Sequence, residues 1–98
     1  MLITGTFRVP PENLDAARSV MAAMIEASRA EEGCELYSYA EDLAEPGLIR
    51  VIETWRDRPS LARHFETAHL ATWRAAWPRL QISDRQLVLY EVGDAEPV

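Results

Sequence analysis

The chain has 98 residues, 48% of them hydrophobic, with a formal net charge of −6 and one cysteine. This length fits a single small domain, residues 1–98, whose modest core would gain from a partner subunit. An acidic chain lacks the clustered Lys and Arg that nucleic-acid binding requires, and one cysteine excludes an internal disulfide. No apolar run is long enough to span a membrane, and the first residues lack the pattern of a secretory signal, so we expect a cytoplasmic protein.

The first part of the chain predicts a strand, a helix and a second strand. "LITGTFRV" (residues 2–9) is rich in β-branched and aromatic residues and is stopped by two prolines. From Pro11 onward the apolar residues recur on one helical stripe, and Gly33 is expected to end this helix. "CELYSYAED" (residues 34–42) is the second predicted strand, and the Pro-Gly pair of "LAEPG" predicts the turn after it.

The third predicted strand, "LIRVIETWR" (residues 48–56), has apolar residues on both faces. Leu48 and Ile52 share one face, while Ile49, Val51 and Trp55 share the other. A strand that is apolar on both faces is expected to be covered on both.

Two helical segments and a strand complete the chain. Pro59 fits the first turn of a helix. Thr67 can cap a second helix, because its hydroxyl oxygen accepts from the backbone N–H groups that follow, so we expect a break near Thr67. This helix is predicted over residues 68–77, with Pro78 making its end uncertain, and "RQLVLYEV" (residues 85–92) is the last strand.

The order β-α-β-β-α-β predicts an α+β, ferredoxin-like fold. Its four-stranded antiparallel sheet carries helices on one face only. We expect the bare face, with some of Ile49, Val51 and Trp55 on it, to be covered by a second copy of the chain. Two sheets packed in this way form a homodimeric α+β barrel, with a pocket in each subunit between helices and sheet.

Three segments resemble the antibiotic biosynthesis monooxygenase family, and within it the small bacterial quinol monooxygenases. "EEGCELYSY" is similar to the family's acidic-Glu-Gly-Cys-x-x-Tyr entry into the second strand. "VIETWRDRPSLARH" is similar to its Glu-x-Trp motif followed by Leu-x-x-His. "FETAHL" is similar to its Thr-Pro-His segment, with Ala68 where the family often has proline.

The resemblance implies a homodimer and a reaction that uses no flavin, heme or metal. A phenol or hydroquinone loses a proton to a general base, and its anion then reduces O2 inside a dry aromatic cavity. The heme-degrading branch of the family instead uses an amide on the first strand and a histidine in the last helix. Gly5 and Arg74 stand at or near those two positions, which argues against heme.

His64 and His69 are the candidate bases. His64 adjoins the apolar stripe of its helix, and a histidine with a reference pKa near 6.5 can act as a base at neutral pH. His69 lies in a first helical turn, where the helix dipole disfavours its protonated form. Each can equally be a structural histidine. Five residues do not place the two on one helical face and no third ligand is evident, so we expect no metal site.

The aromatic residues expected to contact a small aromatic substrate are Phe65, Trp73, Tyr39 and Trp55, with Trp55 alternatively a core or dimer residue. The function this predicts is a cofactor-independent monooxygenase that acts on a small aromatic, phenolic or quinol substrate with O2. Two alternatives remain open. One is an isomerase of the same fold, which would need the same base, and the other is a non-enzymatic, dimeric ligand-binding or stress-associated protein.

Overall fold

The fold is an α+β domain with the element order expected for a ferredoxin-like chain. The computed structural model describes all residues, Met1–Val98. Its elements are β1 (Leu2–Arg8), a 3-10 turn (Pro11–Asn13), α1 (Leu14–Arg29), β2 (Cys34–Glu41), β3 (Leu48–Trp55), α2 (Arg58–Phe65), α3 (Ala68–Leu80) and β4 (Ser83–Tyr90). The strands form one four-stranded antiparallel sheet in the order β2-β3-β1-β4.

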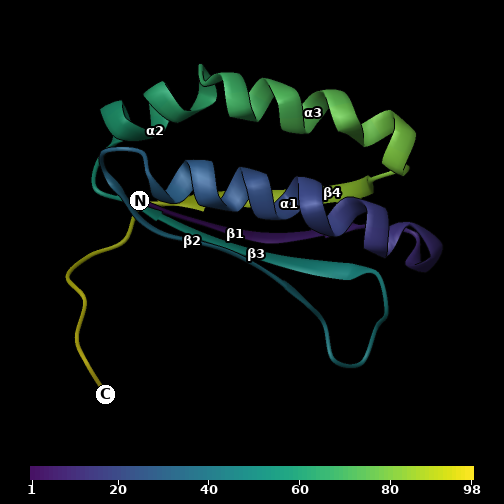
Figure 1. Cartoon of the computed structure of the whole chain (residues 1–98). Helices are drawn as coiled ribbons and strands as arrows, with labels where there is room; N and C mark the ends of the chain where they lie inside the picture. Colours follow the sequence, from purple (N-terminus) through teal and green to yellow (C-terminus); the bar gives the residue numbers. More distant parts are fainter.

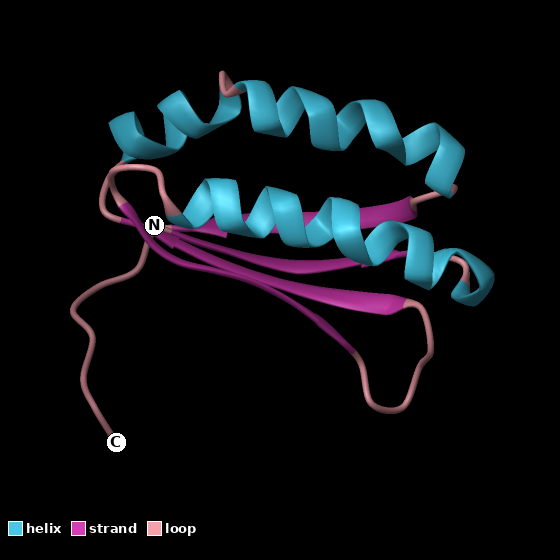
Figure 2. Ribbon diagram, viewed as in Figure 1, coloured by secondary structure: helices cyan, strands magenta, loops and turns pink.

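The three helices cover one face of the sheet and leave the other face bare (Figures 1 and 2). Helix α1 packs on β2 and on α3, and residues from all four strands, including Leu87 of β4 at its margin, join the helices in one core. None of the helices is both long enough and apolar enough to cross a membrane. The predicted two-layer architecture is therefore confirmed.

Strand β1 comes unusually close to β4 at Gly5. Gly5 of β1 is paired with Val51 of β3 on one side and with Leu87 of β4 on the other. A Cβ atom at Gly5 would lie 1.9 Å from the carbonyl oxygen of Gln86. No larger residue fits here unless β4 moves, so the position requires glycine.

The faces of β3 are assigned differently from the prediction. Ile49, Val51 and Trp55 point toward the helices and are buried, together with Glu53. The expectation that some of the three apolar residues lie on the bare face was wrong. Strand alternation puts the three on one face, and the helices pack on that face. Ile52, on the opposite face, is 40% exposed.

The bare face nevertheless carries its own apolar residues. Register places Ile52 of β3 in one row with Val88 of β4, and Leu36 of β2 in the next row with Tyr90 of β4. These four side chains are all exposed, at 40 to 50%. We therefore still expect a second copy of the chain to cover this face, through these four residues and not through those first predicted.

The helix ends place the residues of the site. Helix α1 stops at Arg29, one turn before the expected stop at Gly33, so that Glu31 lies in the turn that leads to β2. The break between α2 and α3 is confirmed: the Oγ1 of Thr67 accepts from the backbone N–H of Leu70 and donates to the carbonyl of His64. Helix α3 continues past the predicted residue 77 to Leu80, with a proline in its last turn.

Candidate functional site

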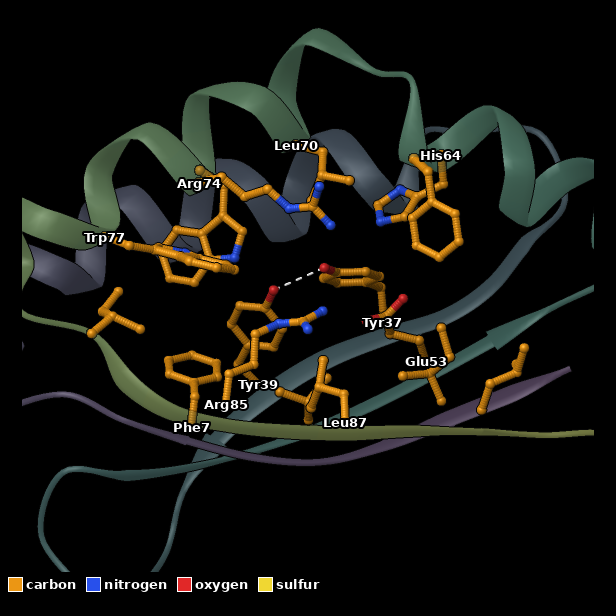
Figure 3. A pocket seen from close by; sticks show the side chains of 16 residues that line it. Phe7, Tyr37, Tyr39, Glu53, His64, Leu70, Arg74, Trp77, Arg85 and Leu87 are labelled. Atoms are coloured by element: carbon orange, nitrogen blue, oxygen red, sulfur yellow. Dashed lines mark hydrogen bonds between the residues drawn. The ribbon is translucent and has the colours of Figure 1, made fainter.

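A cavity of about 170 Å³ lies between α2, α3 and the sheet. Aromatic rings form much of its wall. The ring of Tyr39 lies 5.4 Å from that of Phe7 and 5.9 Å from that of Trp73, and Trp77 packs on Trp73 at 6.0 Å, centroid to centroid. Figure 3 shows the lining side chains converging from the helices above and the strands below. The cavity is therefore mainly apolar, with a few polar groups directed into it.

His64 is the titratable base in this wall. Its side chain, in the last turn of α2, is 2% exposed, and its ring lies 4.6 Å from the ring of Trp55. Its Nδ1 is 2.6 Å from Oε2 of Glu31, so a carboxylate at Glu31 accepts the Nδ1 proton. Nε2 has no protein partner and is not among the buried unpaired atoms, so it faces the cavity that His64 lines.

Two opposing effects set the protonation of His64. Burial lowers the pKa of His64, and the hydrogen bond and negative charge of Glu31 raise it, with burial the larger effect. The imidazole is therefore neutral at neutral pH. With its proton held on Nδ1 by Glu31, its Nε2 lone pair is free to accept a proton from a molecule in the cavity.

His69 shares the same carboxylate from the other side. It lies in the first turn of α3, and its Nε2 is 2.8 Å from Oε2 of Glu31. Its side chain is a quarter exposed and borders an outer groove between α1 and α3, not the cavity. Glu31 thus joins the two histidines of the sequence, and only His64 reaches the cavity.

Glu31, His64 and His69 are also the group of side chains that could hold a metal ion, because their ligand atoms all lie within 4.8 Å of one another. The sequence argument that no third ligand lies nearby was therefore wrong: Glu31 is 33 positions away from His64 along the chain but adjacent in space. Nδ1 of His64 and Nε2 of His69 both lie at hydrogen-bond distance from Oε2 of Glu31, so this oxygen can accept one hydrogen bond from each ring.

Three further polar groups line the cavity on the sheet side. The hydroxyls of Tyr37 and Tyr39 are 2.8 Å apart, and burial raises the pKa of both, so one hydroxyl donates to the other and a second proton stays free. Glu53 is buried and accepts a 3.1 Å hydrogen bond from Nε1 of Trp55. Burial also raises the pKa of Glu53, which favours its neutral form.

The residues predicted to contact substrate are placed unequally. Phe65, Trp73 and Tyr39 line the cavity, with Phe65 half exposed at its edge. Trp55 is fully buried and does not line the cavity; its ring packs against the ring of His64 instead.

Three polar residues of the site were not singled out as binding or catalytic by the sequence: Glu31, Arg74 and Arg85. The double-Glu motif before Gly33 was the only signal for Glu31. The two arginines carry no local motif, so only the folded chain shows that they share a cavity with Tyr39.

Similarity to known proteins agrees with this fold. Residues 1–76 match the family described as "Antibiotic biosynthesis monooxygenase". The chain is 33% identical over 73 residues to "Putative monooxygenase Rv0793" of Mycobacterium tuberculosis, which covers 74% of this chain and 71% of that protein. It is 27% identical over 96 residues to "Uncharacterized protein sll1783" of Synechocystis, covering 98% of this chain but 65% of that longer protein.

A crystal structure has nearly the same architecture. It is described as that of a "putative antibiotic biosynthesis monooxygenase" from Deinococcus radiodurans, and it superposes with a TM-score of 0.91 at 28% identity. The match covers 100% of this chain and 98% of that one. The fold, the family match over most of the chain and the identity to Rv0793 agree, and the chain belongs to the antibiotic biosynthesis monooxygenase family.

Proposed function

We propose that the protein is a cofactor-independent monooxygenase that oxidises a small phenolic or quinol ring with O2. One observation carries this function: the neutral His64 has its Nδ1 proton fixed by Glu31 and presents an unpaired Nε2 to an aromatic cavity. A base held in one tautomer by a carboxylate is pre-oriented for proton removal. A cavity of about 170 Å³ is close to the ~150 Å³ that holds a benzene-sized ring.

The chemistry needs no electron source other than the substrate. His64 Nε2 removes the phenol proton, and the electron-rich anion passes one electron to O2. The two resulting radicals combine to form a carbon–oxygen bond, and the proton held by His64 passes to the peroxide anion to give a hydroperoxide. His64 then removes the remaining hydrogen on that carbon as a proton, the O–O bond breaks to leave a carbonyl and a hydroxide ion, and the proton on His64 converts the hydroxide to water. The substrate supplies all the electrons for the oxygen that is reduced.

The other groups of the cavity fit the same reaction. The free hydroxyl proton of the Tyr37–Tyr39 pair can donate to the developing anion. The rings of Phe7, Tyr39 and Trp73 offer edges and faces for a flat substrate. Excluding water from such an apolar space protects the radical pair from side reactions.

We also propose that the working form is a homodimer joined through the bare face of the sheet. Leu36, Ile52, Val88 and Tyr90 expose apolar surface there, and monomers seldom leave a large contiguous apolar patch uncovered. A two-fold partner presents the same residues in return. An obligate interface of this kind buries roughly 2,000 Å² or more in total.

Oxygen uptake with a panel of hydroquinones and anthrones tests the catalytic function. We expect consumption above the rate without enzyme, and a loss of about 100- to 10,000-fold in turnover for His64→Asn, the usual contribution of a general base. His69→Asn should retain more activity, because His69 does not border the cavity. Absence of uptake with every compound, or full activity in His64→Asn, would contradict the assignment. Turnover that continues without O2 would point to the isomerase instead.

A further inference from the structure

The mouth of the cavity holds two arginines that form no ion pair, Arg74 and Arg85. The arginines that form ion pairs with carboxylates in this chain are Arg8, Arg18, Arg50, Arg56 and Arg58. Arg74 and Arg85 form no ion pair and no hydrogen bond, although the chain as a whole carries a net charge of −6. An acidic protein thus keeps its cavity mouth basic.

The two guanidinium groups approach the cavity from opposite walls. Arg74 descends from α3 and Arg85 rises from β4, and the hydrogen-bonded hydroxyls of Tyr37 and Tyr39 lie beside Arg85 between them (Figure 3). Both arginines are exposed, so they lie at the opening and not in the core. A ring inside the cavity would leave a substituent between these two groups.

The neighbouring polar atoms are donors as well. The guanidinium of Arg85 lies 5.6 Å from the ring centroid of Trp77, whose Nε1–H is the one buried side-chain polar atom in the structure without a hydrogen bond. The carboxyl group of the cavity, Glu53, accepts a hydrogen bond from Trp55 Nε1 and lies beyond ion-pair distance of Arg85, whose charge lowers its pKa by less than burial raises it. This end of the cavity therefore combines two guanidinium groups and an indole N–H with one carboxyl group, Glu53, whose neutral form is favoured by burial.

We propose that Arg74 and Arg85 together bind a carboxylate on the substrate, so that the protein acts on a single-ring aromatic carboxylate with a phenolic hydroxyl. Guanidinium groups match carboxylates through paired N–H···O bonds, which neutral quinols cannot form. Two like charges at one opening also attract anions before they bind. This substrate class rests on the proposed oxygenase function, but the binding site can be tested without turnover.

Calorimetric titration with para-hydroxybenzoate and para-hydroxybenzamide is the test. The two probes share the ring and the phenol and differ in the charge of one substituent. We expect the wild-type protein to bind the carboxylate at least ten-fold more tightly than the amide. Arg74→Gln and Arg85→Gln should each reduce that preference by about ten-fold or remove it, and Arg85→Lys should keep part of it.

Arg79→Gln is the matched control, since Arg79 is an exposed arginine of α3 that does not line this cavity. The Arg79→Gln protein should prefer the carboxylate over the amide as strongly as the wild type does. Raising the salt concentration from about 50 mM to about 500 mM should weaken carboxylate binding and leave amide binding unchanged, which needs no variant. Equal affinity for the two probes, or a preference that survives both glutamine substitutions, would overturn the assignment.

The two proposals fail separately. If neutral quinols consume O2 but the carboxylate is not preferred, the substrate class is wrong and the oxygenase stands. If the carboxylate is preferred through Arg74 and Arg85 but no compound consumes O2, the binding site stands and the oxygenase is wrong.

Discussion

Glu31 provides a test of the base that leaves the cavity wall itself unchanged. Its Oε2 lies 2.6 Å from His64 Nδ1 and 2.8 Å from His69 Nε2, yet Glu31 does not line the cavity. Glu31→Gln preserves the size of the side chain and an oxygen that can accept the Nδ1 proton. What it removes is the negative charge beside the imidazole. We therefore expect a folded protein with a weaker base.

The magnitude follows from the difference between a charged and a neutral acceptor. A hydrogen bond to a charged group contributes about 1.5–3 kcal/mol, and one to a neutral group about 0.5–1.5 kcal/mol. The protonated form of His64 should lose the difference, about 1–2 kcal/mol, because the contact is largely buried. Turnover should fall by roughly 5- to 30-fold if this loss appears fully in the proton transfer.

The direction in which the pKa of His64 moves in Glu31→Gln can also be predicted. In the wild type the charge of Glu31 raises the pKa of His64 against the effect of burial. Without that charge burial is unopposed, so the pKa of His64 falls further. The proposed mechanism requires unprotonated His64, so the acid limb of kcat/KM should move to lower pH while the plateau drops. NMR titration of the His64 ring protons measures the same pKa without any substrate.

Glu32→Gln is the control, because Glu32 is an adjacent, exposed carboxylate that forms a surface ion pair with Arg56 and does not touch His64 through a hydrogen bond. It changes the net charge equally and should leave the pKa of His64 and the plateau unchanged. A pKa of His64 that rises in Glu31→Gln, or an equal loss of activity in both variants, would refute the role given to Glu31.

Three further outcomes are expected. Burial lowers the pKa of His64 below its unfolded value of 6.5; the unfolded chain therefore binds a proton that the folded chain does not, and the free energy of unfolding should fall as pH drops below 6.5. Urea unfolding should show this slope in the wild type and a smaller one in His64→Asn. Sedimentation at micromolar concentration should show a dimer, and Ile52→Arg, at the bare face, should give a monomer. A wild-type protein that is folded and monomeric would refute the proposed dimer. Hemin titration should give no one-to-one Soret shift. The heme-degrading branch uses an amide side chain on the first strand, and Gly5 leaves no room for one. A sharp stoichiometric shift would contradict this.

The fold could be predicted because its signals are local. Pro11, Gly33, Pro59 and Thr67 mark turns and helix ends, and the runs between them alternate with period 2 or 3.6, so the order of elements can be read directly. The topology then follows from general rules of connection. These signals are strong because each depends on residues a few positions apart.

The choice of faces on β3 could not be predicted from the same signals. Ile52 and Val51 are equally apolar, and Glu53, which would ordinarily mark a solvent face, is buried beside Trp55. Only the packing of the helices decides which set lies inside. The site shows the same limit: the sequence offered His64 and His69 as candidate bases without separating them, while Glu31 and Arg85 come from distant segments that join the site only in the fold.

The break at Thr67 explains how one short segment provides both the proposed base and much of the cavity roof. His64 and Trp73 both line the cavity, one from α2 and one from α3. On a single unbroken helix they would be nine positions apart, which at about 100° per residue places them about 180° apart, on opposite sides. The Thr67 cap, bonded to the carbonyl of His64 at 2.7 Å, ends one helix and starts the next in a new direction. The same turn brings His69 back onto Glu31, so the residue that breaks the helix also completes the carboxylate's pair of donors.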